Sequence, residues 1–557
     1  MILYPFRYLW WLFSSIRRSL GKPPEYAVLI VDSPLPALPD LPGPFWQRFV
    51  SRPRLSLKEL GEQFAALARE PRTKGVVLHL RPVPMPMATL QDLRELVERL
   101  RAANKRVVAW APFYTTGTYY LACACDEILM MPGGMVQPLG FATTGMFLAD
   151  GLARFGIEAD FIQVSPYKSA GDMLTKSRMS PELHEQLTWL LESHHKDLVH
   201  AIGESRSLDE KGARELVDSS PFQDSAAADR HVVDGLISEE QLPDHLGGVR
   251  TQARVGTWEQ MQRRLRQPRP TLGRGRYVAI LRIDGTIVDG RSERLPFRPP
   301  VEVPLFGDDR AGDLTVVQTA RQVAADRRAA AVVLYVNSRG GSSTASEAMR
   351  HALEEVAARK PLVVAMGPIA GSGGYWVATP GRWIVARPGT LTGSIGVISG
   401  KIVTSGLFSK LHFNRETIAF GKHATLGADE RPYTREERQI VQHEVEWIYE
   451  RFLDIVGKAR QMARDELQPI AGGRVWTGRQ ALERKLVDEL GGVEAAVTKA
   501  RSLAGLSDRA PVREVRPPRK QIAPPALSSP AGYVGYLVEG VEILSRAPAL
   551  ALMELPY

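Results

Sequence analysis

Cysteine is nearly absent from this chain of 557 residues. Its two cysteines, Cys123 and Cys125, lie two positions apart in an apolar run, so on a strand they would point to the same side. That geometry does not suit a disulfide, and no spacing typical of a metal site accompanies them. The sequence predicts two small buried thiols and gives no sign of a disulfide-stapled secreted protein, although it leaves a periplasmic body open.

The chain also lacks a long hydrophobic run. Residues 2–16 are apolar and aromatic, but their longest uncharged stretch is only nine residues, whereas a spanning helix needs about 20. The positive charge follows this segment, while a secretory signal would carry it first. Trp10 and Trp11 suit a membrane interface. We expect residues 1–22 to be an N-terminal apolar anchor at the membrane surface. The alternatives are a short spanning helix and a helix packed on the protein itself.

The charge of the chain is modest, at +9 over its full length, and no nucleic-acid-binding motif accompanies it. Nucleic acid is therefore not an expected partner. The length is too great for one core and predicts two or three domains.

The chain contains an internal repeat, because residues 114–122 match residues 370–378 at a spacing of 256. The same spacing pairs Tyr119 with Tyr375, Ala122 with Ala378, Ile128 with Ile384, Pro132 with Pro388, Gly133 with Gly389 and Gly140 with Gly396. It also pairs Thr116 with Ser372, so the two copies differ at a position that carries chemistry.

Each copy repeats one order of apolar runs and helical stretches. Strands are expected at 26–31, 76–80 and 107–110 in the first copy and at 277–285, 332–336 and 363–366 in the second, with helices at 90–100 and 345–357. Strands that alternate with helices predict an α/β fold. We divide the chain into residues 1–22, a first repeat at 23–265, a linker at 266–276 and a second repeat at 277–505. A Pro/Arg-rich segment and a C-terminal tail follow at 506–557; residues 509–525 are expected to be extended and mobile, while the more apolar tail could dock on the body, a partner subunit or the membrane.

Ser372 lies among Gly371, Gly373 and Gly374 after an expected strand. A nucleophile at a tight strand-to-helix turn needs small neighbours, so that its hydroxyl is exposed and a backbone N–H can approach the substrate. Gly340 and Gly341 follow another expected strand, where a backbone N–H could face a cleft as an oxyanion hole requires. Together the two loops favour acyl-transfer chemistry over two ordinary capped loops.

A nucleophilic serine needs a base, and no histidine stands out beside a suitable acid. The candidate is Lys168, in the run Ser165-Pro-Tyr-Lys-Ser-Ala-Gly171 of the first repeat. A free lysine has a pKa near 10.4, so a base working near pH 8 requires a fall of roughly 2–3 units. Burial in a poorly hydrated cleft can supply that fall.

These motifs give the chain a specific resemblance. Tyr167-Lys-Ser-Ala170, Gly340-Gly-Ser-x-x-Ala-Ser-Glu347, Ala370-Gly-Ser-Gly-Gly-Tyr375 and Leu391-Thr-Gly-Ser-Ile-Gly-Val397 resemble the signal peptide peptidase A family, also called protease IV, in its long two-repeat form. The resemblance covers about residues 26–505. It implies two tandem ClpP/crotonase-like domains and a Ser–Lys endopeptidase.

The resemblance also implies roles for individual residues. Ser372 would be the nucleophile and Lys168 the general base. Ser394 would hold the lysine amine, while the N–H of Gly373 and that of Gly340 or Gly341 would form the oxyanion hole. Neither a metal nor a cofactor is implied.

The repeat tests this assignment from within. At the positions of Ser372, Gly340, Gly341 and Ser394 the first copy has Thr116, Pro84, Met85 and Pro138, and a proline has no N–H to donate. At the position of Lys168 the second copy has Ala424, with Lys422 and His423 nearby as alternative bases. We expect one dyad split between the repeats, which must then pack against each other across a cleft.

The resemblance implies a membrane-associated serine endopeptidase that hydrolyses hydrophobic peptides, including cleaved signal peptides. Peptide substrates and membrane lipid are the expected partners, and a homotetramer is the expected assembly. The expected location is a bacterial-type inner membrane, with a peripheral or single N-terminal anchor and the side of the body left open. A crotonase-like acyl-CoA enzyme and a non-catalytic membrane scaffold are the alternatives.

Overall fold

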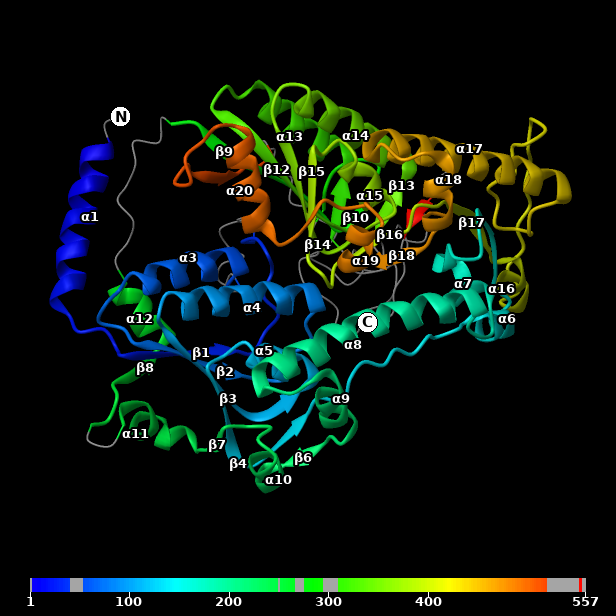
Figure 1. Ribbon diagram of the computed structural model, residues 1–557. Helices are drawn as coiled ribbons and strands as arrows, with labels where there is room; N and C mark the ends of the chain where they lie inside the picture. The colour runs from blue at the N-terminus through cyan, green and yellow to red at the C-terminus, as the bar shows by residue number, and fades with distance from the viewer. Residues whose placement is uncertain are drawn as a thin grey trace. The chain divides into compact units, whose positions relative to one another are not determined.

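The computed structural model describes residues 3–40, 54–248, 251–265, 275–293, 309–517 and 550–552, and it shows an α/β protein (Figure 1). The chain forms two compact units. Unit 1 consists of Met1–Ala142 and Glu192–Gly275, and unit 2 consists of Thr143–Leu191 and Arg276–Tyr557. This division differs from the predicted repeat boundaries, because residues 143–191 belong to unit 2 although their sequence lies within the first repeat.

Unit 1 is built on one sheet with the strand order β6-β4-β3-β2-β1-β8, and β7 also pairs with β4. Its strands are β1 (Tyr26–Val31), β2 (Gly75–Leu80), β3 (Arg106–Thr115), β4 (Glu127–Gln137), β6 (Phe222–Gln223), β7 (Gly235–Leu236) and β8 (Val255–Thr257). Apart from the antiparallel pair of β4 with β6, the pairs are parallel. Every residue of β2 is buried, which fits the continuous apolar run expected of a central parallel strand.

The main sheet of unit 2 repeats this arrangement, with the order β18-β16-β14-β12-β9-β20; in addition, β15 pairs with β14 and β19 pairs with β15. Its strands are β9 (Tyr277–Asp284), β12 (Ala329–Ser338), β14 (Leu362–Gly371), β15 (Trp383–Ala386), β16 (Leu391–Gly393), β18 (Val475–Thr477), β19 (Glu489–Leu490) and β20 (Val512–Glu514). The central order β14-β12-β9 corresponds to β3-β2-β1 of unit 1. The predicted α/β class and the two repeated regions are therefore confirmed.

A second sheet in unit 2 has the order β11-β10-β13-β21-β17-β5. Its strands are β5 (Glu158–Gln163), β10 (Thr286–Val288), β11 (Arg310–Gly312), β13 (Gly340–Ser342), β17 (Ile398–Val403) and β21 (Leu550–Leu552). Strand β5 pairs antiparallel with β17 over six residues, from Gln163 opposite Ile398 to Glu158 opposite Val403. This pairing fastens residues 143–191 to unit 2.

The two helices predicted at 90–100 and 345–357 lie within α4 (Met87–Ala102) and α14 (Ser343–Ala357). The helices of unit 1 include α3 (Leu57–Ala68), α4 (Met87–Ala102), α5 (Thr116–Ala122), α9 (Glu210–Asp218), α10 (Asp224–Asp229), α11 (Leu242–Gly247) and α12 (Trp258–Arg264). Those of unit 2 include α6 (Ala149–Phe155), α7 (Asp172–Thr175), α13 (Asp313–Ala325), α14 (Ser343–Ala357), α15 (Gly373–Ala378), α16 (Ser405–Lys410), α17 (Arg435–Arg460), α18 (Arg464–Leu467), α19 (Gly478–Glu483) and α20 (Val493–Leu503). Helix α8 (Pro181–Arg206) carries the chain from unit 2 back to unit 1.

The N-terminal segment forms helix α1 (Leu3–Leu20). Six of its described apolar side chains are exposed, among them Trp10 and Phe13, which are 73% and 64% accessible. The C-terminal end of α1 is held to unit 1, where Arg18 Nη1 donates to the carbonyl of Leu265 at 2.7 Å. Among the described residues, no helix has both the length and the apolar character needed to cross a membrane.

The cysteines depart from the predicted strand. Cys123 is the C-cap of α5 and Cys125 lies in the turn after it, because the apolar run here is the end of a helix. Both thiols are free and buried, as predicted, and burial raises the pKa of Cys123 to about 11. Among the residues that the structure describes, no group of three or more His, Cys, Asp or Glu could hold a metal ion.

The segment after residue 506 departs from the prediction as well. Val512–Glu514 form β20, a parallel edge strand on β9 with Val512 opposite Val278, so this part of the expected mobile segment is ordered in a sheet. Most of the predicted linker at 266–276, namely residues 266–274, lies outside the described residues, as do residues 518–549.

Candidate active site

Ser372 occupies the turn between β14 and α15. Its backbone has φ 54° and ψ −118°, a region that non-glycine residues rarely adopt and that costs on the order of 1–3 kcal/mol. Two hydrogen bonds hold this conformation: the N–H of Ser372 donates to the carbonyl of Gly393 at 2.8 Å, and the N–H of Trp376 donates to the carbonyl of Ser372 at 2.9 Å. The chain therefore forces this serine into a strained turn, an arrangement that clusters at functional sites.

The side chain of Lys168 ends at Ser372. Its Nζ lies 2.6 Å from Ser372 Oγ, 3.0 Å from Ser394 Oγ and 3.1 Å from the carbonyl oxygen of Ser394. All three residues are buried, with Lys168 1% exposed. This desolvation holds the pKa of Lys168 well below its ordinary value. The predicted base, nucleophile and lysine-orienting serine are therefore brought together.

The three contacts of Lys168 Nζ can be made by either protonation state of the lysine. A neutral amine has two N–H donors and one lone pair, whereas an ammonium has three donors and no acceptor. The two N–H groups of Lys168 can donate to the two oxygens of Ser394, and the lone pair can accept the hydroxyl proton of Ser372. In that arrangement of the neutral amine, the lone pair is directed at the hydroxyl of Ser372.

The segment that carries Lys168 packs against Gly472 and Gly473, two glycines that the sequence motifs did not single out. A Cβ on Gly473 would lie 2.6 Å from Lys168 Cα and 2.7 Å from Lys168 Cβ, and Gly473 has φ +90°. Next to it, the hydroxyl of Ser165 donates to the carbonyl of Gly472. Any side chain at Gly473 would push the lysine away, so only glycine fits. The adjacent glycines were the available signal, but nothing in the sequence linked them to a lysine some 300 residues earlier.

Helix α8, which follows the segment that carries Lys168, contacts the residues just after Gly473. The amide oxygen of Gln186 accepts from the N–H of Val475 at 2.9 Å, and Trp189 Nε1 donates to the carbonyl of Val475 at 2.9 Å. The ring of Trp189 stacks on Trp476 with centroids 4.8 Å apart. These contacts fix the position from which Lys168 reaches Ser372.

The predicted oxyanion glycines lie beside Ser372. A Cβ on Gly373 would lie 3.1 Å from Gly340 Cα, 3.3 Å from Gly341 N and 2.7 Å from Ser346 Oγ. Gly340 and Gly341 have φ 103° and 147°, which L side chains rarely adopt. The residue after the nucleophile is thus packed directly against the glycine pair, as a two-donor site requires.

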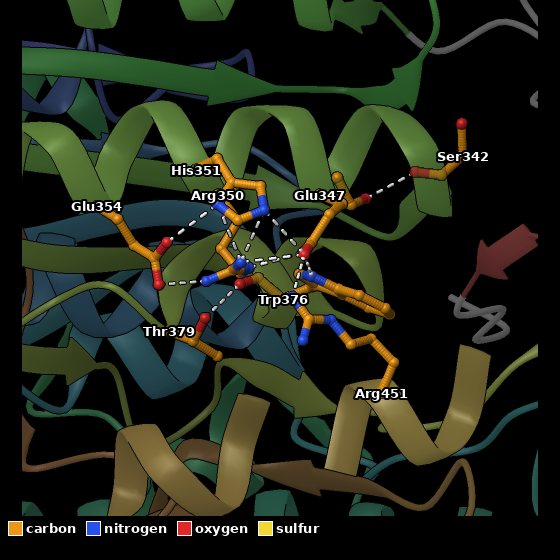
Figure 2. A network of polar contacts seen from close by, with 9 residues as sticks. Ser342, Glu347, Arg350, His351, Glu354, Trp376, Thr379 and Arg451 are labelled. Carbon is orange, nitrogen blue, oxygen red and sulfur yellow. Dashed lines mark hydrogen bonds and ion pairs between the residues drawn. The ribbon is translucent and has the colours of Figure 1, made fainter. Parts of the chain in front are cut away.

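A charged network supports the nucleophile helix from the side (Figure 2). Glu347 on α14 accepts from Trp376 Nε1 at 2.8 Å, from Arg350 Nε at 2.6 Å and from Arg451 Nη2 at 2.8 Å. Burial favours the neutral acid, but the donors outweigh it and lower the pKa of Glu347 to about 2. Trp376 is four residues after Ser372, so this carboxylate links α14 and α17 to α15, the helix that follows Ser372.

Thr116, the residue of unit 1 that corresponds to Ser372, has a different local structure. Thr116 is the first residue of α5, Thr115 caps that helix, and Thr116 Oγ1 donates to the carbonyl of Gly140 at 3.2 Å. Among the described residues of unit 1, the non-glycine residues with positive φ do not include Thr116. Pro84 and Met85 precede α4 in a loop, and Pro138 follows β4. The strained serine turn therefore belongs to unit 2.

The alternative bases of the second repeat lie elsewhere. Lys422 Nζ forms an ion pair with Glu436 at 2.5 Å, and the lysine side chain is 71% exposed. His423 and Ala424 lie in the same exposed turn. Lys168 is the lysine that the described structure places at Ser372.

The dyad lies within one compact unit. Lys168 belongs to Thr143–Leu191, which is part of unit 2 together with Ser372 and Ser394. The first repeat therefore supplies Lys168 through residues 143–191, which are part of its sequence but belong to unit 2 in the structure.

A strained buried serine beside a buried lysine, next to a glycine pair, defines a serine hydrolase of the acyl-transfer class. Comparison with known proteins agrees: the family model described as peptidase family S49 matches residues 99–247 and 354–507, together just over half of the chain. The chain belongs to this family and is a serine peptidase. Each matched region falls in one of the two repeats.

Named relatives extend over most of the chain. "Protease 4" of Salmonella typhi is 32% identical over 446 residues, which cover 78% of this chain and 69% of that protein. "Serine protease SPPA, chloroplastic" of Arabidopsis thaliana is 28% identical over 494 residues, 87% of this chain and 70% of that protein. "Protease 4" of Haemophilus influenzae is 28% identical over 451 residues, 78% of this chain and 71% of that protein. A peptidase family does not fit the acyl-CoA enzyme or the scaffold considered above.

Proposed function

We propose that the chain is a Ser–Lys endopeptidase with Ser372 as nucleophile and Lys168 as general base, built from two ClpP/crotonase-like repeats. The observation that supports it most is the 2.6 Å contact between Lys168 Nζ and Ser372 Oγ, both buried. Burial lowers the pKa of Lys168, so this lysine can take a hydroxyl proton at a lower pH than an exposed lysine can.

In the proposed mechanism Lys168 takes the proton of Ser372 as Oγ attacks the scissile carbonyl. The resulting oxyanion would accept hydrogen bonds from Gly373 N–H and Gly341 N–H. We assign Gly341 ahead of Gly340 because the N–H of Gly340 donates to Ser338 Oγ at 3.1 Å. The protonated lysine then gives its proton to the leaving amine, and water hydrolyses the acyl-enzyme by the same route. Ser394 keeps the amine in place throughout.

We propose hydrophobic peptides, including cleaved signal peptides, as the substrates. This rests on the resemblance of the motifs around Lys168, Gly340 and Ser372 to the signal peptide peptidase A family. A peptide bound in extended form between strand edges would be recognised partly through its backbone, which suits substrates of varied sequence.

Labelling of Ser372 by a fluorophosphonate probe tests the dyad. In the wild-type chain the labelling rate should rise with pH through one ionisation that lies below the ordinary lysine pKa, because the neutral amine is the active form. In Lys168→Met the rate should fall by about 100-fold or more and lose that ionisation. A rate that does not change between pH 6 and 9, or equal labelling of both proteins, would rule out a lysine base.

We propose that α1 anchors the protein at a membrane surface. Its exposed face carries Phe6, Trp10 and Phe13, and its lower end is held to unit 1 through Arg18. Aromatic side chains at this spacing suit the interface between headgroups and acyl chains. The side of the membrane on which the body lies is left open by these contacts.

The double variant Trp10→Ser/Phe13→Ser should weaken binding to vesicles of anionic phospholipid by about 100-fold or more, since each ring contributes about 2–3 kcal/mol when buried. Vesicle co-sedimentation measures this. Trp447→Ser is the matched control, because Trp447 is 66% exposed on α17 but lies outside the anchor. Equal binding by the double variant and the control would move the membrane contact away from α1.

We further propose a homotetramer in a bacterial-type inner membrane, on the resemblance to the two-repeat family alone. Sedimentation of the detergent-solubilised chain measures the assembly directly, and a monomer at micromolar concentration would contradict it.

A further inference from the structure

The C-terminal end of the chain lies in the second sheet of unit 2. Strand β21 (Leu550–Leu552) pairs antiparallel with β13, with Leu552 opposite Gly340, Ala551 opposite Gly341 and Leu550 opposite Ser342. It also pairs antiparallel with β17 through Leu550 opposite Ile398. In Figure 1 it is the short red strand beside the β13 and β17 labels. The tail thus lies between two strands that are distant from it in sequence.

Both neighbours of β21 belong to the proposed active site. On one side, β13 begins with Gly340 and Gly341, the glycine pair beside Ser372. On the other side, β17 begins at Ile398, four residues after Ser394. The far edge of β17 pairs with β5, which ends at Gln163, five residues before Lys168. The tail therefore runs between the proposed oxyanion glycines and the strand that follows the lysine-orienting serine.

The sheet order shows what the tail replaces. In the order β11-β10-β13-β21-β17-β5, strands β13 and β17 are joined through β21. Without β21 each of them would present an open edge to a space one strand wide. Open edges of this kind bind extended peptides through main-chain hydrogen bonds. The sequence Leu550-Ala551-Leu552 is apolar, like the substrates proposed above.

We propose that the C-terminal segment around Leu550–Leu552 occupies the peptide-binding slot between β13 and β17 and competes with substrate there. This inference rests on the proposed function of the site. It also specifies the substrate: an extended apolar peptide that lies antiparallel to both β13 and β17 in place of the tail.

The expected size of the effect follows from the tether. A segment joined to the same chain has an effective concentration of the order of millimolar, while typical KM values lie between about 1 μM and 1 mM. Removing the tail should therefore lower KM for an apolar peptide by about tenfold or more. At saturating substrate the tail is displaced, so kcat should stay the same.

Three variants that retain the rest of the fold test the competition between the tail and substrate, with KM measured for a fluorogenic apolar peptide. Deletion of residues 546–557 should lower KM. Ala551→Pro should do the same with the chain length kept, because proline lacks the N–H that a central strand needs. Ala551→Ser keeps that N–H and should retain the wild-type KM. A KM that is equal in all four proteins would overturn the proposal.

Hydrogen exchange separates this inference from the proposed chemistry. In the Ser372→Ala background, which cannot cut its own tail, the amides of β13 and β17 should exchange more slowly in the full chain than after deletion of residues 546–557. Equal exchange in the two proteins would overturn the tail's occupancy whatever the activity. The opposite outcome is also possible: a clear difference in exchange, but no peptide hydrolysis by the protein that retains Ser372, either with or without residues 546–557. That result would uphold the occupancy by the tail and reject the proposed peptidase site.

Discussion

Replacing Lys168 with methionine should reduce kcat/KM for peptide hydrolysis by about 10⁴-fold or more, and Ser372→Ala should do the same. Loss of any member of a nucleophile–base pair has effects of this order, because the remaining groups cannot act alone. The double variant should be no worse than either single variant, since both remove the same proton transfer. The structure ties this to one contact, the 2.6 Å separation of Lys168 Nζ and Ser372 Oγ.

Lys168→Met should also be more stable than the wild-type chain, and this difference in stability should grow as the pH falls. Burial lowers the pKa of Lys168 in the folded chain, so the unfolded chain binds the proton more readily. The wild-type chain therefore loses stability from pH 10.4 downward, at about 1.4 kcal/mol per pH unit, until the folded pKa is reached. Methionine has a similar length and no charge, so Lys168→Met escapes this loss. Thermal unfolding at pH 7 and pH 10 should show its advantage shrinking as the pH rises.

The control for both measurements is Lys422→Met. Lys422 is exposed and paired with Glu436 in unit 2, so its loss should leave kcat/KM within about twofold and stability within about 0.5 kcal/mol. If Lys168→Met kept near wild-type turnover while Lys422→Met lost it, the base would have to be reassigned to the second repeat.

The sequence predicted the central strands because they depend on local patterns, and it singled out Ser372 and Lys168, whose side chains the structure places in contact. The run Val332–Val336 is apolar throughout, as a strand buried on both faces must be, and β12 includes it. Ser372 is marked by its own glycines, and Lys168 by a motif that the resemblance supplied. Comparison of the repeats then removed Thr116 as a second nucleophile, and the structure shows that residue in an ordinary helix start.

Long-range contacts could not be predicted in the same way. Lys168 packs against Gly473, which lies 305 residues later in the sequence. No local sequence pattern predicts a contact between residues so far apart. Residues 143–191 join unit 2 through the pairing of β5 with β17, although their sequence continues the first repeat. The tail strand β21 is only three residues long and pairs with strands more than 140 residues away. Periodicity identifies a strand but not its partner.

Glu347→Gln should lower the free energy of unfolding of unit 2 by about 2 kcal/mol and slow peptide hydrolysis only modestly. The carboxylate accepts from Arg350 and Arg451 and from the indole N–H of Trp376. Arg350 is itself only 6% exposed at its side chain, so removing the charge of Glu347 leaves this buried guanidinium with Glu354 as its remaining carboxylate partner. The shift of the Glu347 pKa from 4.5 to about 2 corresponds to roughly 3 kcal/mol, which its quarter-exposed side chain reduces through solvent screening.

The pH dependence distinguishes this charge effect from a loss of packing. A carboxyl with a lowered folded pKa stabilises the protein fully above about pH 4.5 and loses that contribution as the pH falls toward about 2. The stability difference between wild type and Glu347→Gln should therefore be constant from pH 8 to 5 and shrink below that. Glu355→Gln on the same helix is the control, because its pair with Arg359 is exposed and should change stability by less than about 0.5 kcal/mol. A difference that persisted unchanged at pH 2.5 would assign the effect of Glu347 to the packing of Trp376 against α14, and not to its charge.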